Sequence, residues 1–298
     1  MLYKEKTMGK NKIISKFLNS IALISPEYLT VSFFGFMAGF FISNMSISLN
    51  IDFLYGLLSI IFLIAGYNSF NAIYDIEIDK INKPNRPLPN KKISKKVAYL
   101  ESIILFILSL YFSLILDLNF FYLIFIGVIL SILYSISYIN LKKRFILGSL
   151  IAIFLYEILP FFSGWFLGKT HTFNMVLFIL ILLPFFFVGG ILKDFEDIRG
   201  DSTNKVHSLL SILGYKKTII TMYLLCIISL FMLLFSIYLN IILFFYLFSI
   251  IFILLVIINI YFLNKSRSIK RGRVSFHLGL LSIILFDLFI ILFYIFFI

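Results

Sequence analysis

Residues 52–79 read DFLYGLLSIIFLIAGYNSFNAIYDIEID, and this stretch indicates the class of the protein. As far as Ile73 it is almost entirely apolar, which is long enough for a helix to cross the hydrocarbon core of a bilayer. Three carboxylates, Asp75, Glu77 and Asp79, follow at once. The pattern predicts a transmembrane helix that ends in an acidic segment at the membrane surface.

Similar apolar runs recur along the whole chain. Of the 298 residues, 61% are hydrophobic and 13% are charged, whereas a soluble domain carries about 25% charged residues. The first run has no small-residue cleavage site after it, so we interpret it as a span and not as a removed signal peptide. Backbone groups inside lipid must be satisfied within the segment, which requires helices. We therefore predict an all-α integral membrane protein, a single domain over residues 1–298, with nine spans at 28–44, 52–73, 97–117, 119–139, 147–168, 173–192, 218–238, 241–263 and 275–297.

Nine spans place the connections on two sides, and the basic residues divide sharply between them. Of the 26 Lys and Arg residues, all except Lys169 fall in the N-terminal segment and in the connections on its side. The positive-inside rule makes this side cytoplasmic. We expect a multi-pass protein of the cell membrane with a cytoplasmic N-terminus and an external C-terminus. The net charge of +12 then reflects topology and contact with anionic membrane lipid, and nucleic acid is not needed to explain it.

Half of the 14 acidic residues lie in two short segments on the basic side. The first contains Asp75, Glu77 and Asp79, and the second, after the sixth span, contains Asp194, Glu196, Asp197 and Asp201. Each includes the string Asp-Ile-x-x-Asp, whose spacing puts the carboxylates on one helical face. The two segments are interpreted as a faint internal repeat that brings two like faces together.

Crowded carboxylates repel one another unless a cation lies between them. Magnesium is usually held by one or two carboxylates together with phosphate oxygens of a substrate. Lys80, Lys83 and Arg86 follow the first segment, and Lys193 and Arg199 accompany the second. One isolated pair at this spacing favours solvated surface charges, but two copies at span ends, both flanked by cations, predict a site for a magnesium diphosphate.

The two segments resemble the aspartate-rich motifs of the UbiA superfamily of intramembrane prenyltransferases. The first is Asn71-Ala-Ile-Tyr-Asp75-Ile-Glu-Ile-Asp79, continued by Lys83-Pro-Asn-Arg86-Pro, and the second is Lys193-Asp-Phe-Glu-Asp197-Ile-Arg-Gly-Asp201. The wording is closest to the archaeal ether-lipid branch, whose members attach a second geranylgeranyl chain to geranylgeranylglyceryl phosphate. The resemblance implies a Mg²⁺-dependent transferase acting on a prenyl diphosphate.

The same resemblance implies roles for individual residues. The implied catalytic residues are Asn71, Asp75, Asp79, Asp194, Asp197 and Asp201, of which Asp75, Asp79, Asp197 and Asp201 would bind the metal. The diphosphate would meet Lys83, Arg86, Lys142 and Lys193. Aromatic faces stabilise cations, so Tyr74, Tyr134 and Tyr138, near the cytoplasmic ends of their spans, are candidates for stabilising an allylic carbocation, with interfacial anchoring as the alternative. Departures from the family pattern occur at Ser25, Tyr28, Ala72, Ser149 and Lys205, and they affect the expected anion contacts and acceptor pocket.

Several alternatives stay open from the sequence. A cation-coupled secondary transporter would also be polytopic, but its ion site is expected near the midplane of the bilayer. The acceptor is either a prenylated glyceryl phosphate or an aromatic acid such as 4-hydroxybenzoate. Lys142, Lys143 and Arg144 are the expected cations for an acceptor phosphate. Glu157 and Asp287 lie inside predicted spans, where ionisable groups are costly and usually functional, and Glu157 is expected to face the acceptor.

Overall fold

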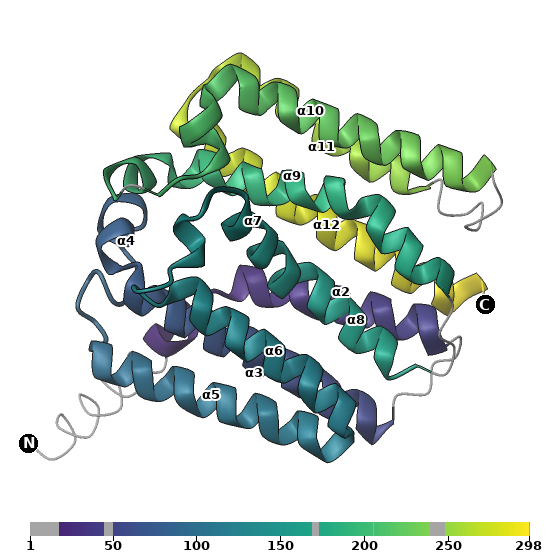
Figure 1. Cartoon of the computed structure of the whole chain (residues 1–298), viewed down its shortest axis with the longest axis horizontal. Coiled ribbons are helices and arrows are strands. Elements are labelled where there is room, and N and C mark those ends of the chain that lie inside the picture. The colour runs from purple at the N-terminus through teal and green to yellow at the C-terminus, as the bar shows by residue number, and fades with distance from the viewer. Residues whose placement is uncertain (1–17, 45–49, 169–172, 205, 239–247, 298) are drawn as a thin grey trace, which may run out of the picture.

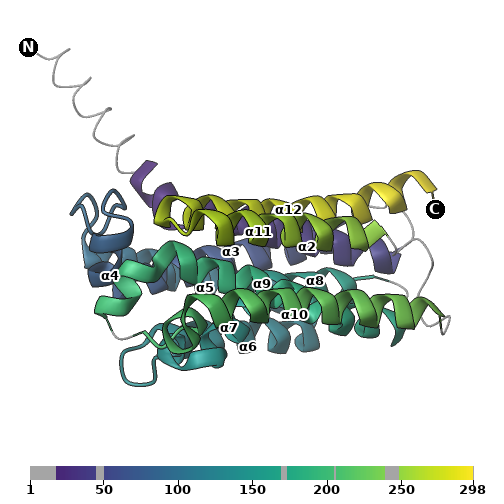
Figure 2. The ribbon, with the colours of Figure 1, turned by 90° about the horizontal axis from the view of Figure 1, so that it is seen from above.

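The structure, a computed structural model, describes residues 18–44, 50–168, 173–204, 206–238 and 248–297, and every regular element in these ranges is helical. Figures 1 and 2 show the long helices lying side by side, with the short helix α4 at one end of the bundle. The elements are α2 (Pro26–Asn44), α3 (Ile51–Tyr74), α4 (Ile76–Asn82), α5 (Lys95–Leu116), α6 (Leu118–Ser135), η1 (Leu141–Lys143), α7 (Phe145–Ile153), η2 (Phe154–Ile158), α8 (Leu159–Phe166), α9 (Phe173–Thr203), α10 (Leu209–Tyr238), α11 (Ser249–Ser266) and α12 (Ile269–Phe297).

Seven helical segments of the described chain are long and apolar enough to cross a membrane. They are α3, α5, α6, the continuous run α7–η2–α8, α10, α11 and α12. The protein is therefore a multi-pass, all-helical membrane protein. The two other spans that the sequence predicts, at 28–44 and 173–192, fall on α2 and α9.

Helix ends differ from the predicted span ends where charge begins. The sixth span was predicted to end at residue 192, but α9 continues to Thr203 and carries the whole second acidic segment. Likewise α10 begins at Leu209 instead of residue 218, and the chain bends at Gly214, whose φ of 71° is a conformation that glycine adopts without strain. Charged residues end a stretch that can sit in lipid, but they do not end a helix.

Close helix contacts fix the frame around the site. On α2, Gly39 faces the backbone of Phe161, and on α8, Gly164 faces the backbone of Phe36, so that a Cβ at either glycine would collide with main-chain atoms. Small residues that let two backbones approach are the usual basis of helix association in membranes. The α2–α8 contact therefore holds the start of α2 in a fixed place relative to η2.

The run α7–η2–α8 is interrupted by one π-helical turn, Phe154–Ile158. A π turn leaves a backbone carbonyl without its usual helical partner, and here Ser32 Oγ on α2 donates to the Tyr156 carbonyl at 2.9 Å. Single π turns inside α-helices are frequent at functional sites. This one carries Tyr156 and Glu157, both buried.

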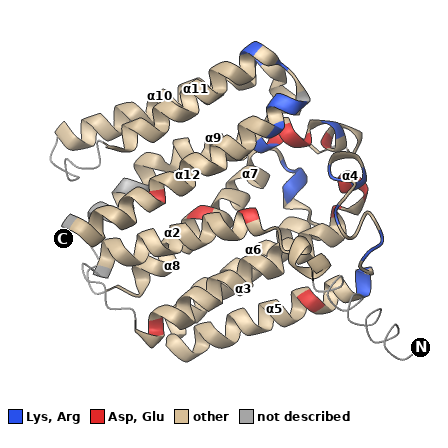
Figure 3. Cartoon of the chain, turned by 180° about the vertical axis from the view of Figure 1, so that it is seen from behind, with Lys and Arg blue, Asp and Glu red and all other residues tan. Residues whose placement is uncertain are grey.

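Charged residues of the described chain are unevenly distributed along the bundle. Figure 3 shows Lys and Arg gathered at the end where α4 lies, whereas the C-terminal end of α12 is at the opposite end. This matches the one-sided distribution expected from the sequence. Lys169, Lys205 and the N-terminal lysines lie outside the described residues.

Candidate active site

The site forms where α4 packs against the charged C-terminal end of α9. Asn82, the last residue of α4, joins the two elements: its Nδ2 donates to the Asp197 carbonyl at 2.9 Å, and its Oδ1 accepts from the Gly200 N–H at 2.8 Å. A Cβ at Gly200 would lie 2.8 Å from the Ile78 carbonyl oxygen. Glycine at this position is thus required by the close approach of α4, and the first and second acidic segments are brought together by backbone contacts.

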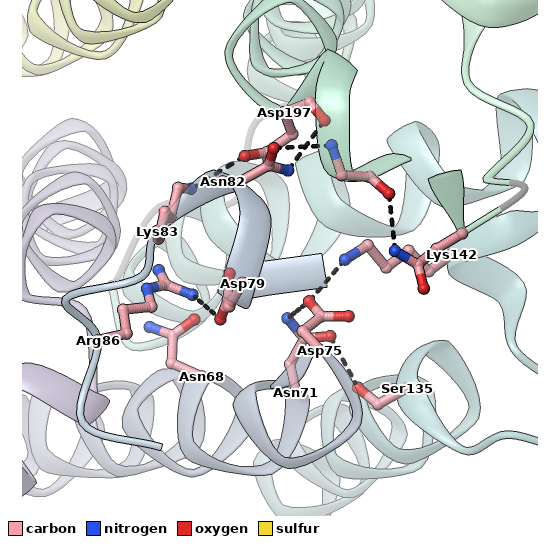
Figure 4. A network of polar contacts seen from close by, with 12 residues as sticks. Asn68, Asn71, Asp75, Asp79, Asn82, Lys83, Arg86, Ser135, Lys142 and Asp197 are labelled. Carbon is pink, nitrogen blue, oxygen red and sulfur yellow. Dashed lines mark hydrogen bonds and ion pairs between the residues drawn. The ribbon is translucent and has the colours of Figure 1, made fainter. Parts of the chain in front are cut away.

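Each of three aspartates from the two segments contacts a basic side chain (Figure 4). Lys142 Nζ lies 2.5 Å from Asp75 Oδ2, Arg86 Nη1 lies 3.0 Å from Asp79 Oδ2, and Lys83 Nζ lies 3.4 Å from Asp197 Oδ1. All three aspartates are buried.

Lys83 also lies 3.2 Å from Glu196 Oε2. Because these pairs are largely desolvated, removing one partner would leave a buried charge uncompensated. The structure places Lys142, Arg86 and Lys83 among the carboxylates, and their role in diphosphate binding stays a prediction.

Asn71 orients the first aspartate. Its Nδ2 donates to Asp75 Oδ2 at 2.8 Å, and its Oδ1 accepts from Ser135 Oγ at 3.3 Å (Figure 4). A bond from an amide to a carboxylate oxygen fixes the direction of the other carboxylate lone pairs. Asn71 is thereby placed in the same network as Asp75, and α6 contributes through Ser135.

Three narrow pockets meet at Lys193, which lines all of them. The polar pocket has both acidic segments in its wall, and it is lined among others by Asp75, Asp79, Lys83, Arg86, Lys142 and Asp197. The second pocket holds Asp194, Asp197, Asp201 and Tyr134. The third is mostly apolar, runs between α2, η2, α9 and α12, and includes Glu157. The polar and apolar pockets share Tyr28, Tyr156 and Lys193, so they are neighbours. A polar pocket beside an apolar one suits a ligand with an anionic head and a hydrocarbon tail.

The aspartates of the second acidic segment differ in how far nearby cations offset the cost of burying their charge. Burial raises the pKa of Asp194 to about 7 and that of Asp201 to about 6, and neighbouring carboxylates add to both shifts. The pKa of Asp197 is lowered, since Lys83 and Lys193 outweigh the effect of its burial. Asp194 Oδ2 and Asp201 Oδ1 are buried oxygens without a hydrogen-bond partner. Buried carboxylate oxygens without a partner are the kind of ligand that a hard cation such as Mg²⁺ binds.

Three or more carboxylate, histidine or cysteine side chains do not come together as a ready-made metal shell anywhere in the described ranges. Magnesium needs fewer protein ligands than that, because substrate phosphate oxygens and water complete its coordination. The unpartnered oxygens of Asp194 and Asp201, beside Asp197, therefore fit a magnesium ion that arrives with a diphosphate.

The aromatic side chains nearest the carboxylates are not all those that the sequence suggested. Tyr134 is buried in the second pocket, as expected. Tyr138 is 97% exposed, and Tyr74 lies beside α5, where its hydroxyl accepts from Tyr99 at 3.1 Å, so neither lines these pockets. Both were proposed because they lie near a span end, which is equally typical of interfacial anchors.

Two stacked tyrosines, Tyr28 and Tyr156, line the polar pocket. Their ring centroids are 4.4 Å apart, and Lys193 Nζ lies 5.6 Å from the Tyr28 centroid. The Tyr156 hydroxyl donates to Asn68 Oδ1 at 2.6 Å, while Asn68 Nδ2 donates to the Ile24 carbonyl. The sequence marked Tyr28 only as a departure from the family pattern and did not identify Tyr156, whose one usable signal is that it precedes Glu157.

Two intramembrane acids lie together deeper in the bundle. Glu157 and Asp287 are both buried, and Asp287 Oδ2 lies beside Gly35 close to the Glu157 carbonyl. Glu157 lines the apolar pocket; that it faces an acceptor stays a prediction. Among the residues that the structure describes, Asp287 Oδ2 has no hydrogen-bond partner.

The fold and these pockets define a multi-pass membrane protein whose two acidic segments meet in a polar pocket beside an apolar one. The family model of the UbiA prenyltransferase family matches residues 32–292, and the chain belongs to that family.

Its relatives include the digeranylgeranylglyceryl phosphate synthases of Methanococcus aeolicus, 37% identical over 68% of this chain and 71% of theirs, and of Methanococcus maripaludis strain C6, 36% identical over 66% and 69%. A solved structure of a digeranylgeranylglyceryl phosphate synthase is similar with a TM-score of 0.66 and 29% identity, and it covers 91% of this chain and 98% of that one. A UbiA homolog from Archaeoglobus fulgidus, solved with GPP and Mg²⁺, shares the fold with a TM-score of 0.69 at 19% identity over 92% and 99% of the two chains.

Proposed function

We propose that this protein transfers a geranylgeranyl group from its diphosphate to geranylgeranylglyceryl phosphate in ether-lipid synthesis. The observation that carries the proposal is the convergence of both acidic segments, with Lys83, Arg86, Lys142 and Lys193, on one polar pocket that lies beside an apolar one and shares Lys193 with it. The choice of acceptor is supported by the names of the relatives, which are synthases of the corresponding product.

The donor diphosphate is assigned to the polar pocket. Asp75, Asp79, Asp197 and Asp201 would hold Mg²⁺, with Asn71 and Asp194 beside them, and bound Mg²⁺ would neutralise the departing diphosphate. The lysines and Arg86 add charge-assisted contacts to its oxygens. The pocket holds both carboxylates, which bind a metal ion, and basic side chains, which bind phosphate oxygens. It therefore suits a ligand that brings both a metal ion and a phosphate.

The reaction exchanges one carbon–oxygen bond for another. The bond between C1 of the prenyl group and the diphosphate breaks, the hydroxyl oxygen of the acceptor forms a bond to C1, and the hydroxyl proton leaves. The allylic cation that develops must be kept from water. Tyr28 and Tyr156 present stacked aromatic faces at the junction of the polar and apolar pockets, where they would stabilise positive charge. Tyr134 contributes from the second pocket.

We also propose that the chain is one domain in the cell membrane with nine spans, with α2 and α9 added to the seven apolar segments. The gathering of Lys and Arg at the α4 end (Figure 3) supports a cytoplasmic site and N-terminus and an external C-terminus.

The direct test is transfer by the purified protein. It should convert labelled geranylgeranyl diphosphate in the presence of Mg²⁺ when geranylgeranylglyceryl phosphate is supplied, and prefer that acceptor to 4-hydroxybenzoate at matched concentration. Preference for the aromatic acid would overturn the lipid assignment and leave the prenyltransferase assignment intact.

A further inference from the structure

A second, much larger cavity lies beside the polar pocket. Its volume is about 650 Å³, and it is formed by the chain after α4, the segment around the start of α2, and the first turns of α12. We call it the basin. Arg273 and His277 from α12 line it, and Lys83 and Arg86 line both the basin and the polar pocket. The two spaces therefore have two basic side chains, Lys83 and Arg86, in common.

Arg273 is the cation of the basin with capacity left for a ligand. Its Nη2 donates to the Asn82 carbonyl at 3.2 Å and its Nε lies 3.6 Å from Glu196 Oε1, yet 55% of its side chain is exposed. A guanidinium has five N–H donors in a fork that matches phosphate oxygens. One of these donors is hydrogen-bonded here, to the Asn82 carbonyl, so others remain for an anion.

His277 lies one helical turn after Arg273, so both side chains are on the same face of α12. Its ring is exposed and contacts Phe276. Phe276 lines the basin and the apolar pocket, and its ring lies 6.1 Å from that of Tyr28. The wall of the basin is thus basic towards the donor site and apolar towards the interior of the bundle.

The cations of the basin differ in how far they are open to a ligand. Lys83 and Arg86 contact Asp197 and Asp79 in the wall of the polar pocket, and their side chains are only 18% and 21% exposed. Lys83 and Arg273 both contact Glu196, and Glu27, at the start of α2, is the other carboxylate of the basin. Arg273, with 55% of its side chain exposed, is therefore the basin cation best placed to meet an anion.

We propose that the basin binds the phosphate of the acceptor, a phosphomonoester on a prenylated glycerol, through Arg273 and His277; this rests on the proposed function. In such an acceptor the attacking hydroxyl is on the second carbon from the phosphate. The acceptor phosphate must therefore lie no further than about the length of one side chain from C1 of the donor's prenyl group. It must also lie outside the pocket that holds the donor diphosphate. A basin separated from that pocket by Lys83 and Arg86 meets both conditions.

The cations at residues 142–144, which the sequence suggested for this phosphate, are placed differently. Lys142 is held by Asp75 and belongs to the donor pocket. Lys143 and Arg144 do not line the basin. The acceptor phosphate is accordingly assigned to α12 and not to the connection before α7.

The test compares two acceptors that differ only in the phosphate, geranylgeranylglyceryl phosphate and geranylgeranylglycerol. In R273Q, kcat/KM for the phosphate ester relative to the alcohol should fall by roughly ten- to a hundred-fold, the effect of losing one charge-assisted contact. In H277Q the same ratio should fall by about two- to ten-fold, because a neutral hydrogen bond is weaker. KM for geranylgeranyl diphosphate should stay within about two-fold of the wild type, as expected for a surface change outside the donor pocket.

Arg271→Gln is the matched control, since it removes the same charge from the same helix end without touching the basin. An equal loss with both acceptors in R273Q, together with an unchanged ratio in H277Q, would mean that α12 is only structural here and would overturn the inference. Failure of the wild type with both glycerol acceptors would instead overturn the proposed function, and with it the inference.

Discussion

Replacing Asn82 by Ala should inactivate the enzyme by loosening α4 from α9, although Asn82 is not expected to touch either substrate. The substitution removes two hydrogen bonds, to the Asp197 carbonyl at 2.9 Å and from the Gly200 N–H at 2.8 Å. Both groups are buried, and each buried group that loses its partner costs about 1–3 kcal/mol. The contact between the two acidic segments should therefore be weakened by about 2–6 kcal/mol if the two losses add.

Catalysis depends on this contact because it joins the two halves of the site. Asp75 and Asp79 lie at α4, whereas Asp197 lies on α9. If only about 2 kcal/mol of the loss reaches the transition state, kcat/KM for geranylgeranyl diphosphate falls about thirty-fold. The assay is initial-rate transfer at saturating acceptor and Mg²⁺, with thermal unfolding in detergent as a check that the bundle survives. Asn90→Ala, at an exposed position of the same connection, is the matched control. A value of kcat/KM for N82A within two-fold of the wild type would refute the reasoning.

Three further predictions address metal, topology and packing. Asp75→Ala should abolish turnover while the protein remains folded, and chelation of divalent cations should do the same to the wild type; full activity in excess chelator contradicts a metal role. Single cysteines at Asn90 and Asn119, with Cys226 replaced, should be labelled from opposite sides of the membrane, and access from the same side would exclude nine spans. Gly200→Ala should lower activity and cost about 1–3 kcal/mol of stability, as overpacking does, because the new Cβ would lie 2.8 Å from a backbone carbonyl; wild-type activity and melting temperature would show that α4 can shift freely.

The membrane helices were largely predictable from sequence, because apolar length is a local property. The predicted span 52–73 corresponds to α3, Ile51–Tyr74, and the one predicted at 97–117 to α5, Lys95–Leu116. The extension of α9 to Thr203 was not predictable from hydropathy, since it depends on α4 packing against its charged end. Hydropathy likewise gives no indication of the π turn at Phe154–Ile158.

The aspartates of the site were identifiable because their spacing is regular, whereas their partners were not. Which cation meets which carboxylate, such as Lys142 with Asp75 across 67 positions, is decided by tertiary packing. The stacking of Tyr28 on Tyr156 was not predictable for the same reason, because it joins α2 to η2 and no local pattern marks it. Asn82 was not identified because both of its partners lie on α9, 115 and 118 positions further along the chain.

The π turn at η2 has a consequence for the evolution of this helix. Its i→i+5 hydrogen bonds enclose one residue more than a turn of α-helix, so deleting one residue from Phe154–Ile158 would close a regular α-helix while α7 and α8 keep their places. A deletion inside α7 would instead rotate one part of that helix by about 100° relative to the other, and Gly148 or Ala152 would turn away from the second pocket that they now line. We therefore expect relatives to differ in length by one residue at this turn more readily than within α7 or α8.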